Sequence, residues 1–210
     1  MRSMFVIAAS AVLLSLAAPA ARANEMSFGL KAGASIPMGD FGDAFGPSFM
    51  GGVYGDMGVA PSFAVGVDVV GNFFSLKKDL KDQLTAAGIT DPKLSFQVYQ
   101  IGVHGKWQQA VATGPEVQVG VALYNGHSKF EGSDPVLGSF SETSSDTKFG
   151  FNVGAGYKFW HSESMSLGLE GSFHNVTDAF KDPNTGDSKS AQYVSVGLDL
   201  GFLTSGTTAK

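Results

Sequence analysis

The chain has 210 residues, a formal net charge of −5 and no cysteine. The length fits a single domain, the lack of cysteine excludes disulfides and thiolate chemistry, and an acidic chain without a basic cluster is not expected to bind nucleic acid. Glycine is frequent, at 28 residues, and 43% of residues are hydrophobic while only 16% are charged. The many glycines indicate that backbone segments lie close together, and the few charged residues indicate a surface that is not mainly charged.

The first 23 residues predict a cleaved export signal. Arg2 precedes an apolar run from Met4 to Leu16, which is shorter than the roughly 20 residues that a membrane-spanning helix needs. A small-residue site at Ala21 to Ala23 follows, so we predict a signal peptide over 1–23 and one mature domain over 24–210. A short N-terminal membrane anchor is the alternative. Export without a later apolar helix leaves the periplasm, the medium or the outer membrane as destinations.

Beyond the signal, apolar and polar residues alternate with a period of two, as in strands whose two faces differ. In the segment 165–176, Met165, Leu167, Leu169 and Phe173 alternate with polar residues and glycine. Seven other segments read in the same way. The predicted strands are 26–36, 49–60, 63–74, 94–109, 115–128, 148–160, 165–176 and 191–202.

The connections between these predicted strands alternate strictly between short and long. Short turns at one end and long loops at the other are typical of a transmembrane β-barrel, and a strand sheet in lipid must close into a ring to satisfy its backbone. One face of the strands is bulky and apolar, whereas the other is polar and rich in glycine, which suits a narrow interior. We therefore predict an all-β fold, an eight-stranded antiparallel up-and-down transmembrane β-barrel. A soluble barrel with its bulky face inside is the alternative.

Aromatic residues gather near both ends of the predicted strands, where membrane proteins place their interfacial girdles. A general preference of aromatic residues for strands is the alternative explanation. The group near the short turns is Phe28, Phe63, Trp107, Phe159, Trp160 and Phe202, and the group near the long loops is Phe49, Phe73, Tyr99, Tyr124, Phe173 and Tyr193.

Seven charged residues fall on the predicted inner face, in the half of the barrel near the short turns. Neighbouring strands predict that Lys31 pairs with Asp56 or Asp199. Buried charges require such pairing. Since eight strands leave no continuous water channel, we expect a plug of salt bridges rather than an ion path. The predicted lumen charge network is Lys31, Asp56, Asp68, Lys106, Lys158, Glu170 and Asp199.

Within this network we expect Lys106 to pair with Asp68, with Asp56 or Asp199 as the alternative partners, and Lys158 to pair with Glu170. Polar side chains on the same face complete the predicted network. They are Tyr54, Gln100, His104, Gln118, Tyr124, Asn152 and His174.

Neither catalysis nor a bound metal or other cofactor is expected. Glu170, Ser172 and His174 share one strand face, but residues two apart on a strand stand about 7 Å apart, too far for a relay. The four histidines show no metal-ligand spacing. A calcium loop over 182–187 is a weak alternative, because Asp-Pro and Asn-x-Gly are ordinary turn signals.

The predicted long loops carry the remaining signals. Leucines at i, i+4 and i+8 with a final Gly88 predict a short amphipathic helix over 76–88. The serine-rich acidic segment 129–147 predicts a solvated loop.

The mature chain resembles the porin-family outer-membrane β-barrel domain, which is related to the transmembrane domain of OmpA. The segment Gly29–Asp43 is similar to that family's first strand and loop, and Leu169–Asp178 to its seventh strand and last loop. The resemblance implies a C-terminal signal for the barrel-assembly machinery, with the pattern polar-x-Gly-x-x-hydrophobic-x-aromatic. The matching residues are Ser195, Gly197, Leu200 and Phe202.

These observations together predict an integral protein of the bacterial outer membrane. Its expected partners are outer-membrane lipid, lipopolysaccharide and the barrel-assembly machinery, and we expect a monomer that binds no nucleic acid. A polar lumen with paired charges favours a role in membrane structure or surface interaction. A narrow pore for ions or small polar solutes is the alternative, and a lipid-modifying enzyme is the least favoured.

Overall fold

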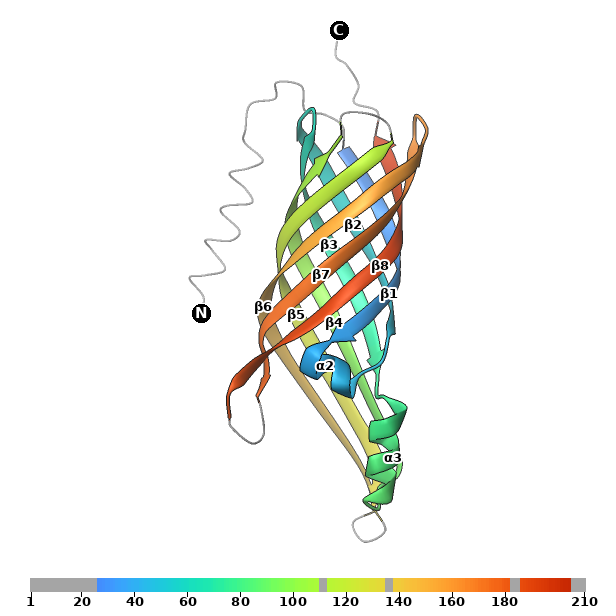
Figure 1. Cartoon of the computed structure of the whole chain (residues 1–210), viewed down its shortest axis with the longest axis vertical. Coiled ribbons are helices and arrows are strands. Elements are labelled where there is room, and N and C mark those ends of the chain that lie inside the picture. The colour runs from blue at the N-terminus through green and yellow to red at the C-terminus, as the bar shows by residue number, and fades with distance from the viewer. Residues whose placement is uncertain (1–25, 110–112, 135–137, 182–185, 205–210) are drawn as a thin grey trace.

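The computed structural model describes residues 26–109, 113–134, 138–181 and 186–204. Eight antiparallel strands form a closed barrel in which each strand pairs with the next (Figure 1). Pairing of the first strand with the last closes the ring. The predicted fold is confirmed, while the predicted signal peptide lies outside the described residues. The strands are β1 (Met26–Met38), β2 (Ser48–Ala60), β3 (Phe63–Ser75), β4 (Thr90–Gln108), β5 (Gly114–Asp134), β6 (Gly138–His161), β7 (Met165–Lys181) and β8 (Ser188–Thr204).

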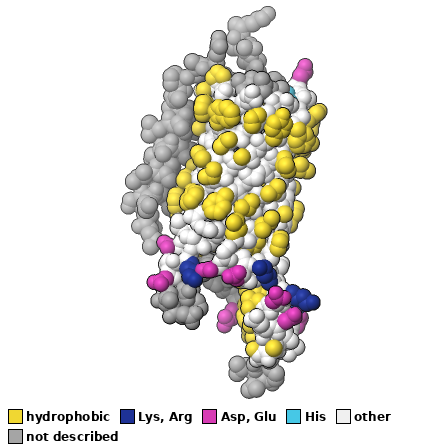
Figure 2. Space-filling view, viewed as in Figure 1, with side chains coloured by type: hydrophobic (Ala, Val, Ile, Leu, Met, Phe, Trp, Pro, Cys, Tyr) yellow, Lys and Arg dark blue, Asp and Glu magenta, His cyan; other side chains and the backbone are white. Residues whose placement is uncertain are grey.

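The bulky apolar face of the wall points outward. Ile101 is 64% exposed, whereas its inward neighbour Gln100 is 2% exposed, and the same alternation runs along the other strands. On the side seen in Figure 2, hydrophobic side chains cover the barrel wall and charged side chains gather near the long-loop end. This arrangement agrees with a lipid-facing exterior and rules out the alternative of a soluble barrel with a bulky interior.

Glycines on the inner face let the strands and the luminal side chains come close together. A Cβ atom on Gly33 of β1 would collide with backbone atoms of Val196 and Gly197 on β8. A Cβ atom on Gly29 would overlap the ring of Tyr54. The high glycine content therefore follows from the narrowness of an eight-stranded barrel.

Two helices lie among the long connections, α2 (Gly39–Ala44) and α3 (Lys78–Ala86). The predicted helix over 76–88 is confirmed by α3, whereas α2 was not predicted. Gly39 opens α2 with a left-handed φ of 56°, and the helix carries Phe41 into a buried position at the mouth of the barrel. Neither helix of the described residues is long and apolar enough to cross a membrane.

The segment 129–147 is largely exposed over 138–147, as its composition predicts, but it is not a loop. β5 and β6 continue through it as a paired hairpin as far as Asp134 and Gly138. Phe130 and Phe140 contact each other on this hairpin with ring centroids 5.3 Å apart. Cross-strand hydrogen bonding and ring contact thus outweigh the polar composition. β7 and β8 likewise continue beyond the predicted strand ends.

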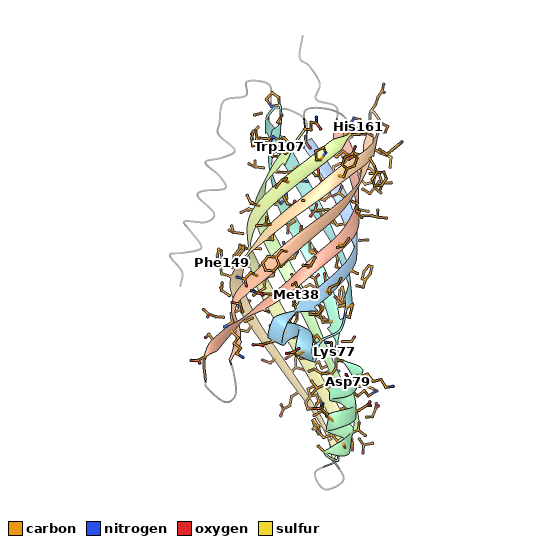
Figure 3. The ribbon with its side chains drawn as sticks, in the orientation of Figure 1. Met38, Lys77, Asp79, Trp107, Phe149 and His161 are labelled. Atoms are coloured by element: carbon orange, nitrogen blue, oxygen red, sulfur yellow. The ribbon has the colours of Figure 1, made fainter. Side chains whose placement is uncertain are left out.

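The two predicted aromatic groups are partly confirmed. Figure 3 places Trp107 at the short-turn end, together with His161, while Lys77 and Asp79 lie at the long-loop end. A register shift between Lys158 and Trp160 turns both Phe159 and Trp160 outward.

Two members of the long-loop group do not belong to the girdle, although for Tyr124 the assignment to the luminal network is confirmed. Tyr124 and Tyr193 are each 1% exposed and point into the lumen. Their position in the alternation, on the same face as the luminal polar residues, determines this direction.

Candidate functional site

The candidate site is the lumen, where the structure places all seven charged residues of the predicted network. Each lies within five residues of the short-turn end of its strand. Six are buried, and Lys158 is half-buried. Strand alternation therefore brings the predicted residues to one face, although their pairing differs from the prediction.

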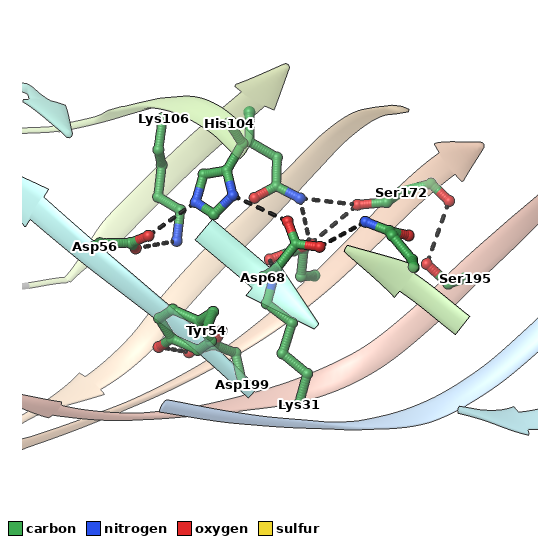
Figure 4. A network of polar contacts seen from close by, with 12 residues as sticks. Lys31, Tyr54, Asp56, Asp68, His104, Lys106, Ser172, Ser195 and Asp199 are labelled. Atoms are coloured by element: carbon green, nitrogen blue, oxygen red, sulfur yellow. Dashed lines mark hydrogen bonds and ion pairs between the residues drawn. The ribbon is translucent and has the colours of Figure 1, made fainter. Parts of the chain in front are cut away.

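The first cluster is organised around two aspartates that share one histidine (Figure 4). His104 contacts Asp56 Oδ1 through Nε2 at 2.8 Å and Asp68 Oδ2 through Nδ1 at 3.1 Å. Lys106 Nζ donates to Asp56 Oδ2 at 2.7 Å, and Gln100 Nε2 donates to Asp68 Oδ1 at 2.6 Å. Each aspartate thus has contacts on both oxygens, as buried carboxylates require.

The strand register explains why Asp56 and His104 meet. Gly66 of β3 pairs with Asp56 on one side and with His104 on the other. A Cβ atom on Gly66 would collide with Asp56 Oδ1 and lie 2.6 Å from His104 Nε2. Because Gly66 of β3 has no side chain, the side chains of Asp56 on β2 and His104 on β4 can meet above it.

A second cluster connects opposite parts of the wall. Lys31 Nζ donates to Glu170 Oε2 at 2.7 Å, with both side chains at most 10% exposed. The other oxygen of Glu170 accepts from Gln118 Nε2 at 2.7 Å and from Ser172 Oγ at 3.0 Å. These bonds join β1, β5 and β7 across the lumen.

Tyr54 contacts both clusters. Its hydroxyl donates to Asp199 Oδ1 at 2.7 Å. The ammonium groups of Lys106 and Lys31 lie 4.9 and 5.2 Å from the centroid of its ring. Such distances fit cation–π attraction, which strengthens in desolvated surroundings.

The predicted salt-bridge partners need correction. Lys106 pairs with Asp56, one of its two alternatives, and not with Asp68. Lys31 pairs with Glu170, and Asp199 accepts from a tyrosine instead. The prediction paired residues on neighbouring strands by depth alone, but long lysine side chains reach over intervening glycines to strands further round the ring.

Lys158 is also wrongly paired by the prediction. Its Nζ lies 3.5 Å from Gln108 Oε1, while Glu170 is occupied by Lys31. Lys158 pairs with Gly168 in the register, and Glu170 pairs with Gly156. The two side chains therefore start from different depths.

A layer of aromatic and amide groups lies above the charged clusters, toward the long loops. His174 stacks on Tyr193 with ring centroids 4.4 Å apart, and its ring nitrogens contact Tyr124 Oη at 3.2 Å and Ser195 Oγ at 3.0 Å. Asn72 Oδ1 accepts from the Ser35 hydroxyl at 2.6 Å. This layer extends the polar network through the middle of the barrel.

Aromatic rings gather at the mouth above this layer. Phe41 of α2 lies 5.0 Å from Phe74 and 5.7 Å from Phe96, measured between ring centroids. Phe74 in turn lies 5.6 Å from Tyr193. No sequence signal pointed to this contact, because a single phenylalanine in a loop has no periodicity.

Two cavities lie at opposite ends of the barrel and share no lining residue. The cavity at the short-turn end has about 540 Å³ and is lined in part by Asp56, Glu116, Lys158 and Asp199. The cavity at the long-loop mouth has about 230 Å³ and has Tyr124 among its lining residues. The charged clusters and the aromatic layer occupy the space between them.

The prediction missed Glu116 as a luminal charge. Glu116 is 6% exposed and lines the larger cavity. The signal was available, because Glu116 is two residues from Gln118 on the same strand face. Glu116 lies inside the predicted strand 115–128, so the same alternation that assigned Gln118 would have assigned it.

The expected separation of about 7 Å along β7 was wrong for one pair, because the Ser172 hydroxyl donates to Glu170 Oε1 at 3.0 Å. His174 contacts Ser195 rather than Ser172, and both residues of this pair are at most 6% exposed. The described residues contain no group of three or more His, Asp or Glu side chains that would hold a metal ion. Most of the weakly indicated calcium loop over 182–187 lies outside the described residues.

The four residues of the predicted assembly signal lie on β8 and divide between its faces. Ser195 and Gly197 point into the lumen, where Ser195 contacts His174. Leu200 lies on the outward face, and so does Phe202, which stacks on Phe28 with centroids 5.4 Å apart. Phe202 closes the ring beside β1, since these two residues also pair in the register.

Comparison with known proteins gives one family and several structures. Residues 7–202 match the family described as the outer membrane protein beta-barrel domain. No curated protein matches the chain. Neisserial surface protein A has a similar structure, with 12% identity and a TM-score of 0.51 over 86% of this chain and 97% of that one.

Two further structures are similar to a comparable degree. The attachment invasion locus protein of Yersinia pestis has 10% identity and a TM-score of 0.51 over 87% of this chain and 98% of that one. A major outer membrane protein from Thermus thermophilus has 14% identity and a TM-score of 0.52 over 85% of this chain and 99% of that one. At these identities the likeness is one of fold.

Proposed function

This chain belongs to the outer membrane protein beta-barrel domain family, and from that premise we propose that it is an outer-membrane barrel with a closed lumen, serving membrane structure or surface interaction. It spans the membrane with its apolar wall toward lipid and carries its long hairpins and α3 on the outer surface. Within its own membrane the barrel is a monomer, since the closed ring leaves no strand edge in the lipid.

One observation carries this proposal: buried and mutually bonded side chains occupy the lumen between the two end cavities. The Lys106–Asp56 and Lys31–Glu170 pairs, at 2.7 Å each, join strands two apart in the ring. Gln118 of β5 links Glu170 to the strand opposite β1, and the stacked rings of His174 and Tyr193 lie above them. An eight-stranded barrel leaves only enough space for its own side chains. A filled lumen supports a structural or surface role over transport.

Export and assembly follow from the same proposal. The signal peptide over 1–23 directs the chain across the inner membrane and is removed. The barrel-assembly machinery recognises Ser195, Gly197, Leu200 and Phe202. Outer-membrane lipid and lipopolysaccharide then surround the apolar wall, whose outward residues include Phe49 at 61% exposure.

The protein is proposed not to be an enzyme. The Ser195–His174 contact is the nearest approach to a nucleophile and base, with 3.0 Å between Oγ and Nε2. The other ring nitrogen of His174 contacts a tyrosine hydroxyl rather than a carboxylate. Both residues are buried, so a lipid or peptide substrate has no path to the serine.

A narrow pore is the second candidate function. The observation that favours it is the 540 Å³ cavity at the short-turn end, which has charged groups of both signs in its lining. An opening of the network above this cavity would join it to the outer mouth.

The test is single-channel recording of the refolded 24–210 protein in a planar lipid bilayer. The proposed function expects no steady conductance from the wild-type protein. Asp56→Ala and Lys106→Ala, which break the first cluster, should produce brief openings. Steady wild-type conductance whose ion selectivity shifts in these variants would overturn the closed lumen and establish the pore.

A further inference from the structure

The β5–β6 hairpin has one strand edge that no described residue covers. β6 pairs with β7 only from Gly150 onward, whereas its pairing with β5 begins at Gly138. Figure 1 shows the β5–β6 hairpin leaving the barrel in a different direction from the β7–β8 hairpin. The segment 138–149 is therefore an edge strand outside the lipid, and we call it the β6 edge.

Two hydrogen bonds show which backbone groups of the β6 edge point away from β5. The Thr177 hydroxyl donates to the Phe149 carbonyl oxygen at 2.7 Å. The Thr147 backbone N–H donates to the Oδ1 atom of Asp146 at 2.8 Å. In an antiparallel strand the N–H and C=O of one residue point to the same side, and the side alternates. Ser145, Thr143 and Ser141 therefore direct their N–H and C=O groups to the open side.

The β6 edge carries few of the features that usually prevent strand addition, its charged residues being Glu142 and the Asp146–Lys148 pair at 2.8 Å. Edge strands are commonly protected by proline, lysine or a covering element. The β6 edge has no proline and a single lysine, Lys148 at its base, and its side chains are mostly exposed. The other edge of the same extension is covered, since Leu76 before α3 donates its N–H to the Leu94 carbonyl oxygen on β4 at 3.3 Å.

We propose that the β6 edge pairs with the β6 edge of a second copy of this chain, antiparallel and centred on Ser145. The proposal rests on the proposed role at the cell surface and names the partner. A two-fold axis makes such an interface self-complementary, and main-chain hydrogen bonds supply the contact as in other strand additions.

Charge and the length of free strand together favour this register. With Ser145 opposite Ser145 of the second copy, Glu142 lies opposite Lys148 of the second copy, and symmetry makes this pair twice. Centring the interface on Ser144 would place Glu142 opposite Asp146, and centring it on Asp146 would place two aspartates opposite each other. Opposite charges stabilise cross-strand pairs and like charges destabilise them. Centring the interface on Thr147 would also place Asp146 opposite Lys148, but only residues 145–149 would then pair outside the two barrels, because β6 pairs with β7 from Gly150 onward. The Ser145 register pairs residues 141–149 and is therefore favoured.

The pairing places the two barrels at opposite ends of one joined sheet. Antiparallel strands reverse direction, so Gly150 of one copy lies level with Phe140 of the second copy. About ten residues, or roughly 33 Å of strand, then separate the two barrel rims. The contact therefore joins proteins in two facing membranes rather than neighbours in one membrane.

The first test is sedimentation velocity of the refolded protein in detergent, where no bilayer restricts orientation. The wild-type protein is expected to form a concentration-dependent dimer. Ser145→Pro removes an N–H that points to the open side and leaves the β5 ladder intact, and it should weaken the dimer at least tenfold. Ser145→Ala is the matched control, which removes the hydroxyl but keeps the backbone N–H, and it should dimerise like the wild type.

The second test determines the register by cross-linking, for which the absence of native cysteine provides a clean background. Glu142→Cys and Lys148→Cys proteins are mixed and oxidised. The mixture should give a disulfide-linked dimer, whereas each variant alone should give little. Glu142→Lys should weaken the dimer, and adding Lys148→Glu to the same chain should restore it.

The orientation is tested with lipid vesicles that carry the protein with its loops outward. Wild-type vesicles should cluster, and Ser145→Pro vesicles should stay dispersed. A wild-type protein that is monomeric at all concentrations, a dimer unaffected by Ser145→Pro, or cross-linking without vesicle clustering would overturn the proposal. Channel recordings of Ser145→Pro should match the wild type, so failure of this proposal is distinct from failure of the closed lumen.

Discussion

Asp56 on β2 and His104 on β4 are joined at 2.8 Å although a whole strand separates them. The residue between them in the register is Gly66, whose missing side chain leaves the space for the contact. Lys106 and Asp68 attach to the same pair. The first luminal cluster therefore depends on a residue that forms none of its hydrogen bonds.

Gly66→Ala should destabilise the barrel by breaking this contact. The added methyl group would force Asp56 and His104 apart and leave a buried carboxylate with fewer partners, so we expect a loss of about 2–4 kcal/mol in the free energy of unfolding. Urea titration of the protein refolded in lipid vesicles measures it. Gly105→Ala, where nothing lies within 4 Å of the added atom, should be nearly neutral. Equal losses from both variants would contradict the role of Gly66.

Lys106 should couple energetically to Asp56 more strongly than to Asp68. Lys106 forms its ion pair with Asp56 at 2.7 Å, and Asp68 is reached only through His104. Double-mutant cycles with alanine should give about 1–3 kcal/mol for Lys106 with Asp56 and a clearly smaller value for Lys106 with Asp68. A larger coupling energy for Lys106 with Asp68 than with Asp56 would support the pairing predicted from the sequence and contradict the Lys106–Asp56 ion pair.

Phe41→Ala should destabilise the outer mouth without opening the lumen. Phe41 is 4% exposed and lies among Phe45, Phe74 and Phe96, so its loss should cost about 3 kcal/mol as a core truncation. Channel recordings should show no new conductance, because the charged clusters below stay intact. The lipid-facing Phe49→Ala is the control and should cost less. Openings in Phe41→Ala would mean that the aromatic mouth is the barrier.

Leu169→Arg should be costly because this side chain faces lipid. Leu169 is 48% exposed on the outer wall, and an arginine near the middle of the bilayer costs about 2–4 kcal/mol in a β-barrel. Phe63→Arg, at the short-turn interface, should cost about 0–1 kcal/mol. Folding into detergent, followed by comparing gel mobility of boiled and unboiled samples, verifies that each variant still forms a barrel. A benign Leu169→Arg would place this face away from lipid.

Much of this fold could be predicted from the sequence because its signals are local. The alternation around Leu169 and Ser172 determined which face is apolar, and the leucine spacing before Gly88 determined α3. The seven luminal charges were assigned correctly to the inner face for the same reason, since successive residues of a strand must point to opposite sides.

Only the tertiary structure decided which luminal groups meet. Lys31 reaches Glu170, and Asp56 reaches His104, because strand stagger and glycine gaps bring together side chains that are not on adjacent strands. The sequence also did not reveal how long β6 is. Its polar residues before 148 pair with β5 just as its apolar residues do, so composition did not mark where the strand begins. Contacts between strands depend on register and on empty space across the barrel, and neither leaves a periodic pattern along a single chain.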